Sequence, residues 1–156
     1  MKTFDHQSVI GLREWIDLPD LGVAGLRAKI DTGASTSTLH ATEIVQFERD
    51  GRPWVRFTAH LGTLVQLRHR RCEAPLVAVK TIKSSNGQAQ TRYVILTRLV
   101  LGDRAWPVEF TLTCRKAMRY RVLLGSKALI QAQLVVNPAL TYVQDKPLLP
   151  FLSGVQ

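Results

Sequence analysis

An apolar strand runs into an acidic turn at Ala28-Lys29-Ile30-Asp31-Thr32-Gly33-Ala34. The apolar residues Ala28 and Ile30 alternate with Lys29, which predicts a half-buried strand with Lys29 and Asp31 on the same side. The end of an apolar strand is an unusual place for a carboxylate, and the glycine lets the backbone turn closely beneath it. Asp-Thr-Gly is also an ordinary turn sequence, so this pattern alone leaves a structural and a catalytic interpretation open.

The rest of the chain is also predicted to form strands. Val55–Ala59 and Val108–Leu112 alternate apolar and polar residues, whereas Leu76–Val79 and Tyr93–Leu101 are more continuously apolar and are predicted to be covered on both faces. Only Ser126–Ala132 has the composition of a short helix. The pattern therefore predicts a mainly β domain, a barrel or a sandwich, with turns at Asp50-Gly51, Asn86-Gly87, Gly102-Asp103 and Asn137-Pro138.

The length of 156 residues predicts one domain over residues 1–146, followed by a tail at residues 147–156. The first residues lack the apolar run of a signal peptide, and no stretch is long enough to cross a bilayer. We therefore expect a cytoplasmic protein with no membrane partner. Cys72 and Cys114 form no Cys-x-x-Cys pair, and both are expected to be reduced thiols.

The formal net charge of +9 suits an anionic partner, such as nucleic acid, a ribosomal surface or a glutamate-rich peptide. Basic residues gather at Arg68-His69-Arg70-Arg71 and at Arg115-Lys116 with Arg119 and Arg121. The first cluster contains no aromatic residue and the second contains one, Tyr120, so neither shows the repeated interleaved aromatic residues that a base-stacking surface uses. A solvated basic face is an equally good interpretation of each cluster.

The order of these segments resembles the retropepsin family of aspartic peptidases. In that family an Asp-Thr-Gly-Ala turn is followed by a flap hairpin, a second hairpin, and an apolar strand that ends in glycine before one short helix. The counterparts here are Asp31–Ala34, Ile82–Gly87, Tyr93–Leu112 and Val122–Gly125. The resemblance implies a closed retropepsin-like (acid protease) β-barrel with one short C-terminal helix.

More closely, the chain resembles the bacterial retropepsin-like proteins long labelled ATP-dependent zinc proteases, which are often encoded beside ATP-grasp glutamate ligases that modify ribosomal protein S6. The matching pieces are Ile10–Trp15 with Leu18-Pro19, Ala28–Ala34, Lys83–Gly87 and Leu123–Gly125. Two positions depart from the family pattern, since Ser126 stands where arginine is usual and Cys114-Arg115 replaces an acid-arginine pair. The resemblance implies a functional link to a glutamate ligase and to S6.

The resemblance assigns catalysis to Asp31, Thr32 and Gly33. Peptide hydrolysis by this chemistry needs two carboxylates that share one proton, and aspartic proteases are the established example of such a pair. Because the chain has a single Asp-Thr-Gly, the second carboxylate is expected to be Asp31 of another subunit in a two-fold homodimer. Thr32 would then lock the two turns together.

Substrate binding is assigned to the turn and to a hairpin. Gly33 and Ala34 keep the floor of the cleft shallow. A flap that closes over an extended peptide is expected at Ser84, Ser85, Asn86 and Gly87. An exposed Asn-Gly hairpin with no catalytic part is the alternative interpretation.

Lys29 has three possible roles. It could favour the ionised form of the nearby carboxylate, bind an acidic substrate side chain, or form a structural ion pair with Glu14 or Glu43, which is the preferred interpretation. Arg13, Glu14 and Trp15 are expected in the first strand, where the tryptophan packs and the charges mark the edge of the barrel.

We expect no cofactor, neither ATP nor zinc. The chain has no Gly-x-x-x-x-Gly-Lys-Ser/Thr loop to hold phosphates and no His-Glu-x-x-His helix to hold a metal. His40 and Glu43 stand three residues apart, and His60 and His69 could join them, but histidines scattered through a β-rich chain more often lie on its surface.

The predicted function is therefore an aspartic-type peptidase that hydrolyses peptide bonds, with acidic or glutamate-rich peptides as its substrates. Two alternatives belong to other classes. One is a non-catalytic basic β-barrel that binds the ribosome or RNA, and the other is a metal-dependent hydrolase.

Overall fold

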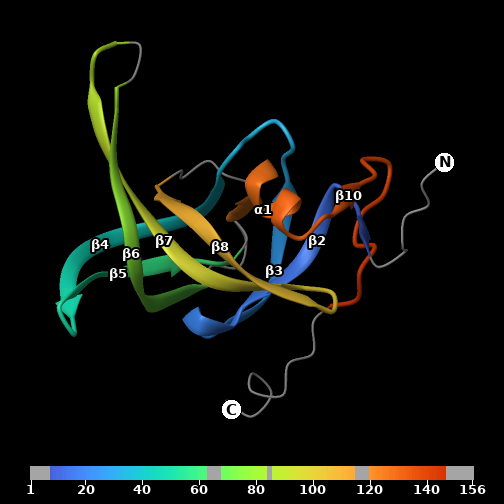
Figure 1. Ribbon diagram of the computed structural model, residues 1–156, viewed down its shortest axis with the longest axis horizontal. Coiled ribbons are helices and arrows are strands. Elements are labelled where there is room, and N and C mark those ends of the chain that lie inside the picture. The colour runs from blue at the N-terminus through green and yellow to red at the C-terminus, as the bar shows by residue number, and fades with distance from the viewer. Residues whose placement is uncertain (1–7, 63–67, 84–85, 115–119, 147–156) are drawn as a thin grey trace.

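The computed structural model describes residues 8–62, 68–83, 86–114 and 120–146 (Figure 1). The described part is mainly β with one short α-helix, as predicted. Its elements are β1 (Val9–Ile10), β2 (Arg13–Leu18), the 3-10 helix η2 (Pro19–Leu21), β3 (Val23–Ile30), β4 (Ser37–Arg49), β5 (Arg52–His60), β6 (His69–Lys83), β7 (Ala89–Leu101), β8 (Arg104–Thr113), β9 (Val122–Leu124), α1 (Ser126–Gln131) and β10 (Val135–Val136).

The strands close into a ring. β2 pairs with β3, β3 with β9, β9 with β4, β4 with β8, β8 with β7, and β7 pairs back with β2. β5 and β6 form a second path between β4 and β7. This closure removes most free strand edges and confirms the predicted closed barrel.

The barrel interior is filled from the alternating strands. Phe57 of β5 and Phe110 of β8 are fully buried, and Ala28 and Ile30 of β3 point inward on either side of the exposed Lys29. Burying one such aromatic side chain contributes roughly 1.5–3 kcal/mol. The period-two patterns therefore predicted the inward face of these strands correctly.

The prediction that Leu76–Val79 and Tyr93–Leu101 are covered on both faces is wrong. Val77 and Val79 on β6 are each 49% exposed, and Leu96 on β7 is 41% exposed. A single-layered barrel covers only the inner face of each strand, and here the outer face carries β-branched and aliphatic side chains in place of polar ones. The continuous apolar run therefore misled the burial assignment, although both segments are strands.

Glu14 on β2 is not an edge charge, which corrects the expectation for the first strand. Its side chain is fully buried, and its carboxylate accepts hydrogen bonds from the backbone N–H groups of Gly11 (2.7 Å), Val143 (2.9 Å) and Gln144 (3.1 Å). Trp15 packs as expected, with its ring 5.1 Å from that of Tyr142. Glu14 thus joins the start of the chain to the segment after β10.

Several expectations fall on residues outside the described part, namely the tail at residues 147–156, Ser84 and Ser85, and most of the second basic cluster at residues 115–119. Cys72 is a buried free cysteine and Cys114 is an exposed one. In the described residues, neither the length nor the hydropathy of any helix suits a crossing of the membrane.

Candidate functional site

The turn after β3 holds Asp31 by its backbone and its side chain. The Asp31 N–H donates to the Leu124 carbonyl at 2.9 Å, and the Ala34 N–H donates to the Asp31 carbonyl at 3.3 Å. The Asp31 Oδ1 accepts a hydrogen bond from the Gly33 N–H at 3.0 Å. The carboxyl group is half-buried, so it is fixed in orientation and still open to water or to another molecule.

A second layer of contacts fixes the turn against the start of α1. The N–H groups of Ser126 and Lys127 donate to the carbonyls of Ala34 (2.7 Å) and Ser35 (3.1 Å). A Cβ atom on Gly125 would lie 2.5 Å from the Thr36 carbonyl oxygen, so only glycine fits there. The contact uses the backbone of Ser126, and the serine in place of the usual arginine therefore leaves it intact.

Ser37 is a positioning residue that the sequence patterns did not indicate. It is buried at the start of β4, and its hydroxyl oxygen accepts a hydrogen bond from the Gly125 N–H at 3.0 Å. The bond ties the chain that leaves the Asp31 turn to the end of β9. A serine in a hydroxyl-rich stretch carries no signal for this role, since its partner lies 88 positions away in the chain.

Thr32 and Gly33 lie at the exposed tip of the turn. Their exposure is what a contact with a second subunit would require. Gly33 does not adopt a left-handed conformation, and an added Cβ would meet the Asp31 Oδ1 at 3.3 Å. Glycine therefore suits this position because it lies close to the carboxylate, and not because it adopts an unusual backbone angle. This refines the reason inferred from the sequence.

Lys29 is exposed on β3, but the preferred ion pair with Glu14 or Glu43 is not present in the described part of the chain. The Glu14 carboxylate is occupied by backbone N–H groups, and Glu43 lies 3.8 Å from the Arg71 guanidinium. Lys29 is exposed and Asp31 is half-buried, with the buried Ile30 between them, and a role of Lys29 at the Asp31 turn stays a prediction.

The predicted flap is the end of the β6–β7 hairpin. The hairpin projects from the barrel, and in the view of Figure 1 its free end lies toward the same side of the molecule as the turn between β3 and β4. Asn86 and Gly87 belong to the connecting turn, where Asn86 Oδ1 accepts from the Gln88 N–H and Gly87 has a φ of 84°. The hairpin itself is thus confirmed, and its action as a flap stays a prediction.

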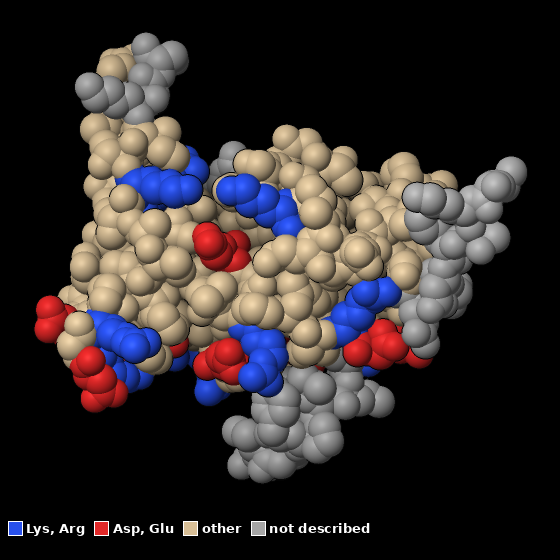
Figure 2. Space-filling model, in the orientation of Figure 1, with Lys and Arg blue, Asp and Glu red and all other residues tan. Residues whose placement is uncertain are grey.

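A cleft of about 390 Å³ separates this hairpin from α1. Figure 2 shows it as a hollow with an acidic group at its base and basic groups on either side. The charged residues that line it are Glu109, Lys80 and Lys127, and Thr36 and Ser37 connect it to the Asp31 turn. The sequence patterns did not indicate these three charges, because each lies on a different element.

Two other aspartates, Asp17 and Asp20, are held in contacts of their own. Asp17 is buried on β2, where burial raises the pKa of its carboxyl group and the Gly25 N–H donates to its Oδ1 at 2.8 Å. Asp20 accepts from the Arg98 N–H at 3.3 Å. In the described residues, no hydrogen bond joins either acid to Asp31.

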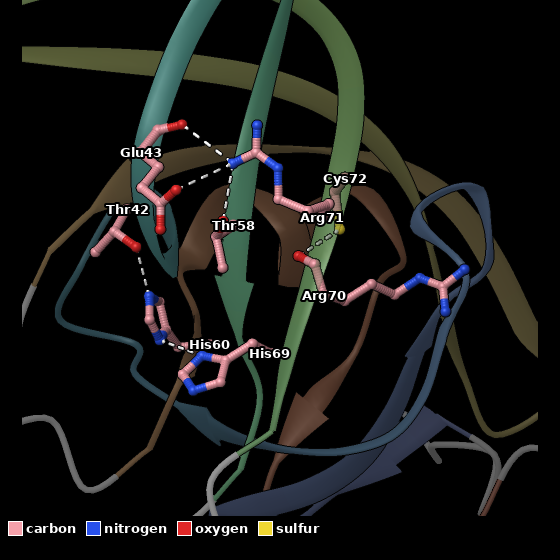
Figure 3. Close-up of polar contacts among 8 residues, drawn as sticks. All are labelled: Thr42, Glu43, Thr58, His60, His69, Arg70, Arg71 and Cys72. Atoms are coloured by element: carbon pink, nitrogen blue, oxygen red, sulfur yellow. Dashed lines mark hydrogen bonds and ion pairs between the residues drawn. The ribbon is translucent and has the colours of Figure 1, made fainter.

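Three histidines that were expected on the surface from the sequence, His40, His60 and His69, have their rings packed in a row, here called the histidine stack. Figure 3 shows His60 and His69. The ring of His60 lies 4.6 Å from that of His40 and 4.7 Å from that of His69. His60 Nε2 shares a 2.6 Å hydrogen bond with Thr42 Oγ1, and His60 and His69 share one between their Nδ1 atoms at 3.0 Å. The surface prediction is wrong for His40, which is only 3% exposed.

The histidine stack does not form a metal site in the described residues, where no group of three or more His, Cys, Asp or Glu side chains could hold a metal ion. The His60 nitrogens are used by Thr42 and His69, and His40 Nδ1 lies 3.2 Å from the Thr113 carbonyl. Ring packing and hydrogen bonds thus account for these contacts.

We expect the histidine stack to make the fold less stable at acidic pH. Burial lowers the pKa of His40 and of His60, and the neighbouring histidines and Arg121 lower that of His60 further, against an opposing effect of Glu43. A histidine whose pKa is lowered in the folded state takes up its proton first in the unfolded chain, so stability falls as the pH drops below about 6.5.

The measurement is the melting temperature between about pH 7.5 and pH 5, a window above the ordinary carboxylate range. We expect a fall of about 2–4 °C, equivalent to roughly 1 kcal/mol in a domain of this size, and a smaller fall in His60→Gln. Asp17 acts in the opposite sense because its pKa is raised. An equal fall in the wild type and in His60→Gln would contradict a contribution from the stack.

Comparison with known proteins gives two kinds of relative. A family model described as RimB-like, retropepsin-like aspartic endopeptidase RimB, matches residues 9–147. Proteins named probable alpha-L-glutamate ligase from Desulfotalea psychrophila and Shewanella pealeana are 40% and 45% identical to the chain over 134 and 131 residues. These matches cover 86% and 84% of the chain but 29% of each relative, so the chain spans less than a third of the length of the curated relatives it matches.

A solved structure shares the same fold. It is the crystal structure of Lpg0085, a protein of unknown function from Legionella pneumophila, with a TM-score of 0.73 and 34% sequence identity. The match covers 86% of this chain and 96% of that one. The match therefore includes most of this chain and almost the whole of the Legionella pneumophila chain.

Proposed function

Because the chain belongs to the RimB-like family of retropepsin-like aspartic endopeptidases, we propose that it is an aspartic peptidase with Asp31 as its catalytic carboxylate. The observation that carries the proposal is the Asp31 turn, in which a half-buried carboxylate is held by the Gly33 N–H at 3.0 Å and the turn is fixed to β9 and α1. A carboxylate fixed in this way is oriented to activate a water molecule.

The proposal requires a second carboxylate, and a two-fold homodimer supplies it. A single carboxylate cannot both activate water and donate a proton to the substrate carbonyl, whereas two carboxylates at hydrogen-bonding distance share one proton. The exposed tip at Thr32 and Gly33 is the part of the turn that would meet its copy in the partner subunit. Each half of the active site is then completed by the other.

We propose acidic, glutamate-rich peptides as the substrates. The cleft between the β6–β7 hairpin and α1 carries Lys80 and Lys127 on its walls, and an ammonium group attracts a substrate carboxylate. The relatives named as probable alpha-L-glutamate ligases connect the family to glutamate chemistry. More than two thirds of each of those proteins lies outside the matched region, so the ligase name supports a functional link and not a ligase activity of this barrel.

The partners that fit this role are a glutamate ligase and ribosomal protein S6, with the cytoplasm as the compartment in which they meet. Incubation of the protein with S6 that carries a glutamate-extended C-terminus should shorten the extension, as measured by intact-mass spectrometry. Unmodified S6 should keep its mass. If both forms of S6 keep their mass under conditions in which the protein is folded and dimeric, the proposed substrate is wrong.

A non-catalytic basic barrel remains the competing function, and the positive charge is the observation that favours it. It predicts salt-dependent binding of RNA or ribosomes with no cleavage. The two functions differ in their dependence on Asp31, because binding through basic faces does not need that carboxylate.

A further inference from the structure

A second basic hollow lies outside the Asp31 site. It is a groove of about 1110 Å³ between β6, η2 and the adjoining ends of β7 and β8. Small-molecule sites commonly occupy about 300–1,000 Å³, so the groove has room for a stretch of polypeptide. Its lining includes five arginines, namely Arg49, Arg56, Arg70, Arg71 and Arg98, but only two acidic residues, Asp20 and Glu73.

The groove contains an open strand edge. All six residues from Arg70 to Pro75 line it, although consecutive strand residues point to opposite faces, so the edge of the strand itself faces the groove. Over this segment β6 pairs only with β5, and its pairing with β7 begins at Leu76. In the part of the chain that the structure describes, no main-chain hydrogen bond outside the β5–β6 ladder reaches Arg70–Pro75.

An unpaired edge of this kind can accept an added strand. In an antiparallel pair, every second residue turns its N–H and C=O groups away from the partner strand, here toward the groove. Extended peptides bind such edges through main-chain hydrogen bonds, and side chains beside the edge set the preference for sequence. The cations along the edge therefore determine which peptide fits.

The groove already holds one carboxylate. Glu73 accepts hydrogen bonds from Arg49 at 2.8 Å and from Arg56 at 3.0 Å, and these bonds lower its pKa. Arg70 and Arg71 leave β6 in opposite directions (Figure 3). Arg70 Nε donates to the Leu21 carbonyl at 3.1 Å and Arg71 Nη1 donates to Thr58 Oγ1 at 2.9 Å. Because a guanidinium group carries five N–H donors, each arginine keeps donors for a further carboxylate, and the Arg98 side chain adds a positive charge at the far wall.

Aromatic rings lie beside two of these arginines. Arg49 lies over the ring of Trp54 at 4.2 Å, and Arg56 lies over that of Phe47 at 4.9 Å. Nucleic-acid bases need open aromatic faces for stacking. Guanidinium groups already cover a face of each of these two rings, which disfavours their stacking with bases. Trp106 also lines the groove, so the test includes an RNA probe.

We propose that this groove binds an extended acidic segment of a polypeptide, which adds as a strand to the free edge of β6 while its carboxylates meet the surrounding arginines. The groove would hold part of a long acidic chain away from the Asp31 turn. The choice of an acidic partner rests on the proposed function, but binding in the groove does not require cleavage.

The test measures the anisotropy of a fluorescent ten-residue glutamate peptide with the full chain carrying Asp31→Asn, so that no cleavage interferes. Arg98→Glu should weaken binding at least about 10-fold. Arg70→Glu should weaken it by as much, provided that the variant has the same melting temperature as the parent protein. The matched control is Arg52→Glu, an equal charge change outside the groove, and it should weaken binding less than about 2-fold.

Two further probes separate the possible results. A peptide with alternate N-methylated residues keeps its charge but cannot pair as a strand, and it should bind at least about 10-fold more weakly. Equal loss in Arg52→Glu and Arg98→Glu would overturn the proposal in favour of unspecific charge attraction. Tighter, groove-dependent binding of a ten-nucleotide uridylate RNA would overturn it in favour of RNA. Because the binding assay uses Asp31→Asn, each of these results leaves the proposed peptidase activity to be tested separately with the wild type.

Discussion

Asp31→Asn is expected to lower the rate of peptide cleavage by roughly three orders of magnitude, within the 10²–10⁴ range typical of a lost acid or base. The amide keeps an oxygen that can accept the hydrogen bond now donated by the Gly33 N–H at 3.0 Å, so the turn should keep its shape. It cannot take a proton from water, and it removes one carboxylate from each half of the dyad. The measurement compares kcat on a glutamate-rich peptide with the melting temperature of the same sample.

The control is Asp103→Asn, the same substitution at the exposed turn between β7 and β8, which should leave the rate unchanged. Mixing the wild type with an excess of Asp31→Asn adds a test of the dyad, because mixed dimers hold one carboxylate and should be inactive. A rate per wild-type chain that stays constant in the mixture would show that one chain carries a complete site. Activity that survives Asp31→Asn but is lost on adding a chelator would point to metal-dependent hydrolysis.

The fold was predictable because its signals are local. Alternation at Val55–Ala59 and Val108–Leu112, together with turn residues such as Asp50-Gly51, indicates strands and their inward faces without knowledge of the partner strands. The closure of the barrel came from the resemblance and not from the pattern, since pairings such as Asp17 with Val100 join residues far apart in the chain. The exposure of side chains on the outer face was mispredicted, because the hydropathy of a strand does not show whether one of its faces is covered or both.

The same distinction between local and long-range signals applies to the candidate site. The Asp31 turn was found because its residues are adjacent in the sequence. Lys80, Glu109 and Lys127 were not, because the cleft that they line forms only when the β6–β7 hairpin, β8 and α1 come together. The histidine stack and the arginine groove were missed for the same reason, since spacing along the chain says nothing about residues on neighbouring strands.

Glu14→Ala is expected to cause the largest loss of stability. The fully buried carboxylate accepts hydrogen bonds from three backbone N–H groups, two of them on the segment after β10. A buried donor left without a partner costs about 1–3 kcal/mol, so the loss should be at least roughly 3 kcal/mol, with a melting temperature lower by about 6–12 °C. Urea unfolding followed by circular dichroism measures the free energy of unfolding.

Glu14→Gln separates the hydrogen bonds from the charge. The glutamine carbonyl can still accept from part of the set, so an intermediate loss is expected. Glu48→Ala, which removes an exposed glutamate from β4, should change the free energy by less than about 0.5 kcal/mol. Amide exchange gives a local readout, because in Glu14→Ala the Val143 and Gln144 N–H groups should exchange faster than those of the barrel strands. If Glu14→Ala loses less than about 1 kcal/mol and these amides stay protected, the chain after β10 is held by its contacts with Leu12 and Arg13 and not by the buried carboxylate.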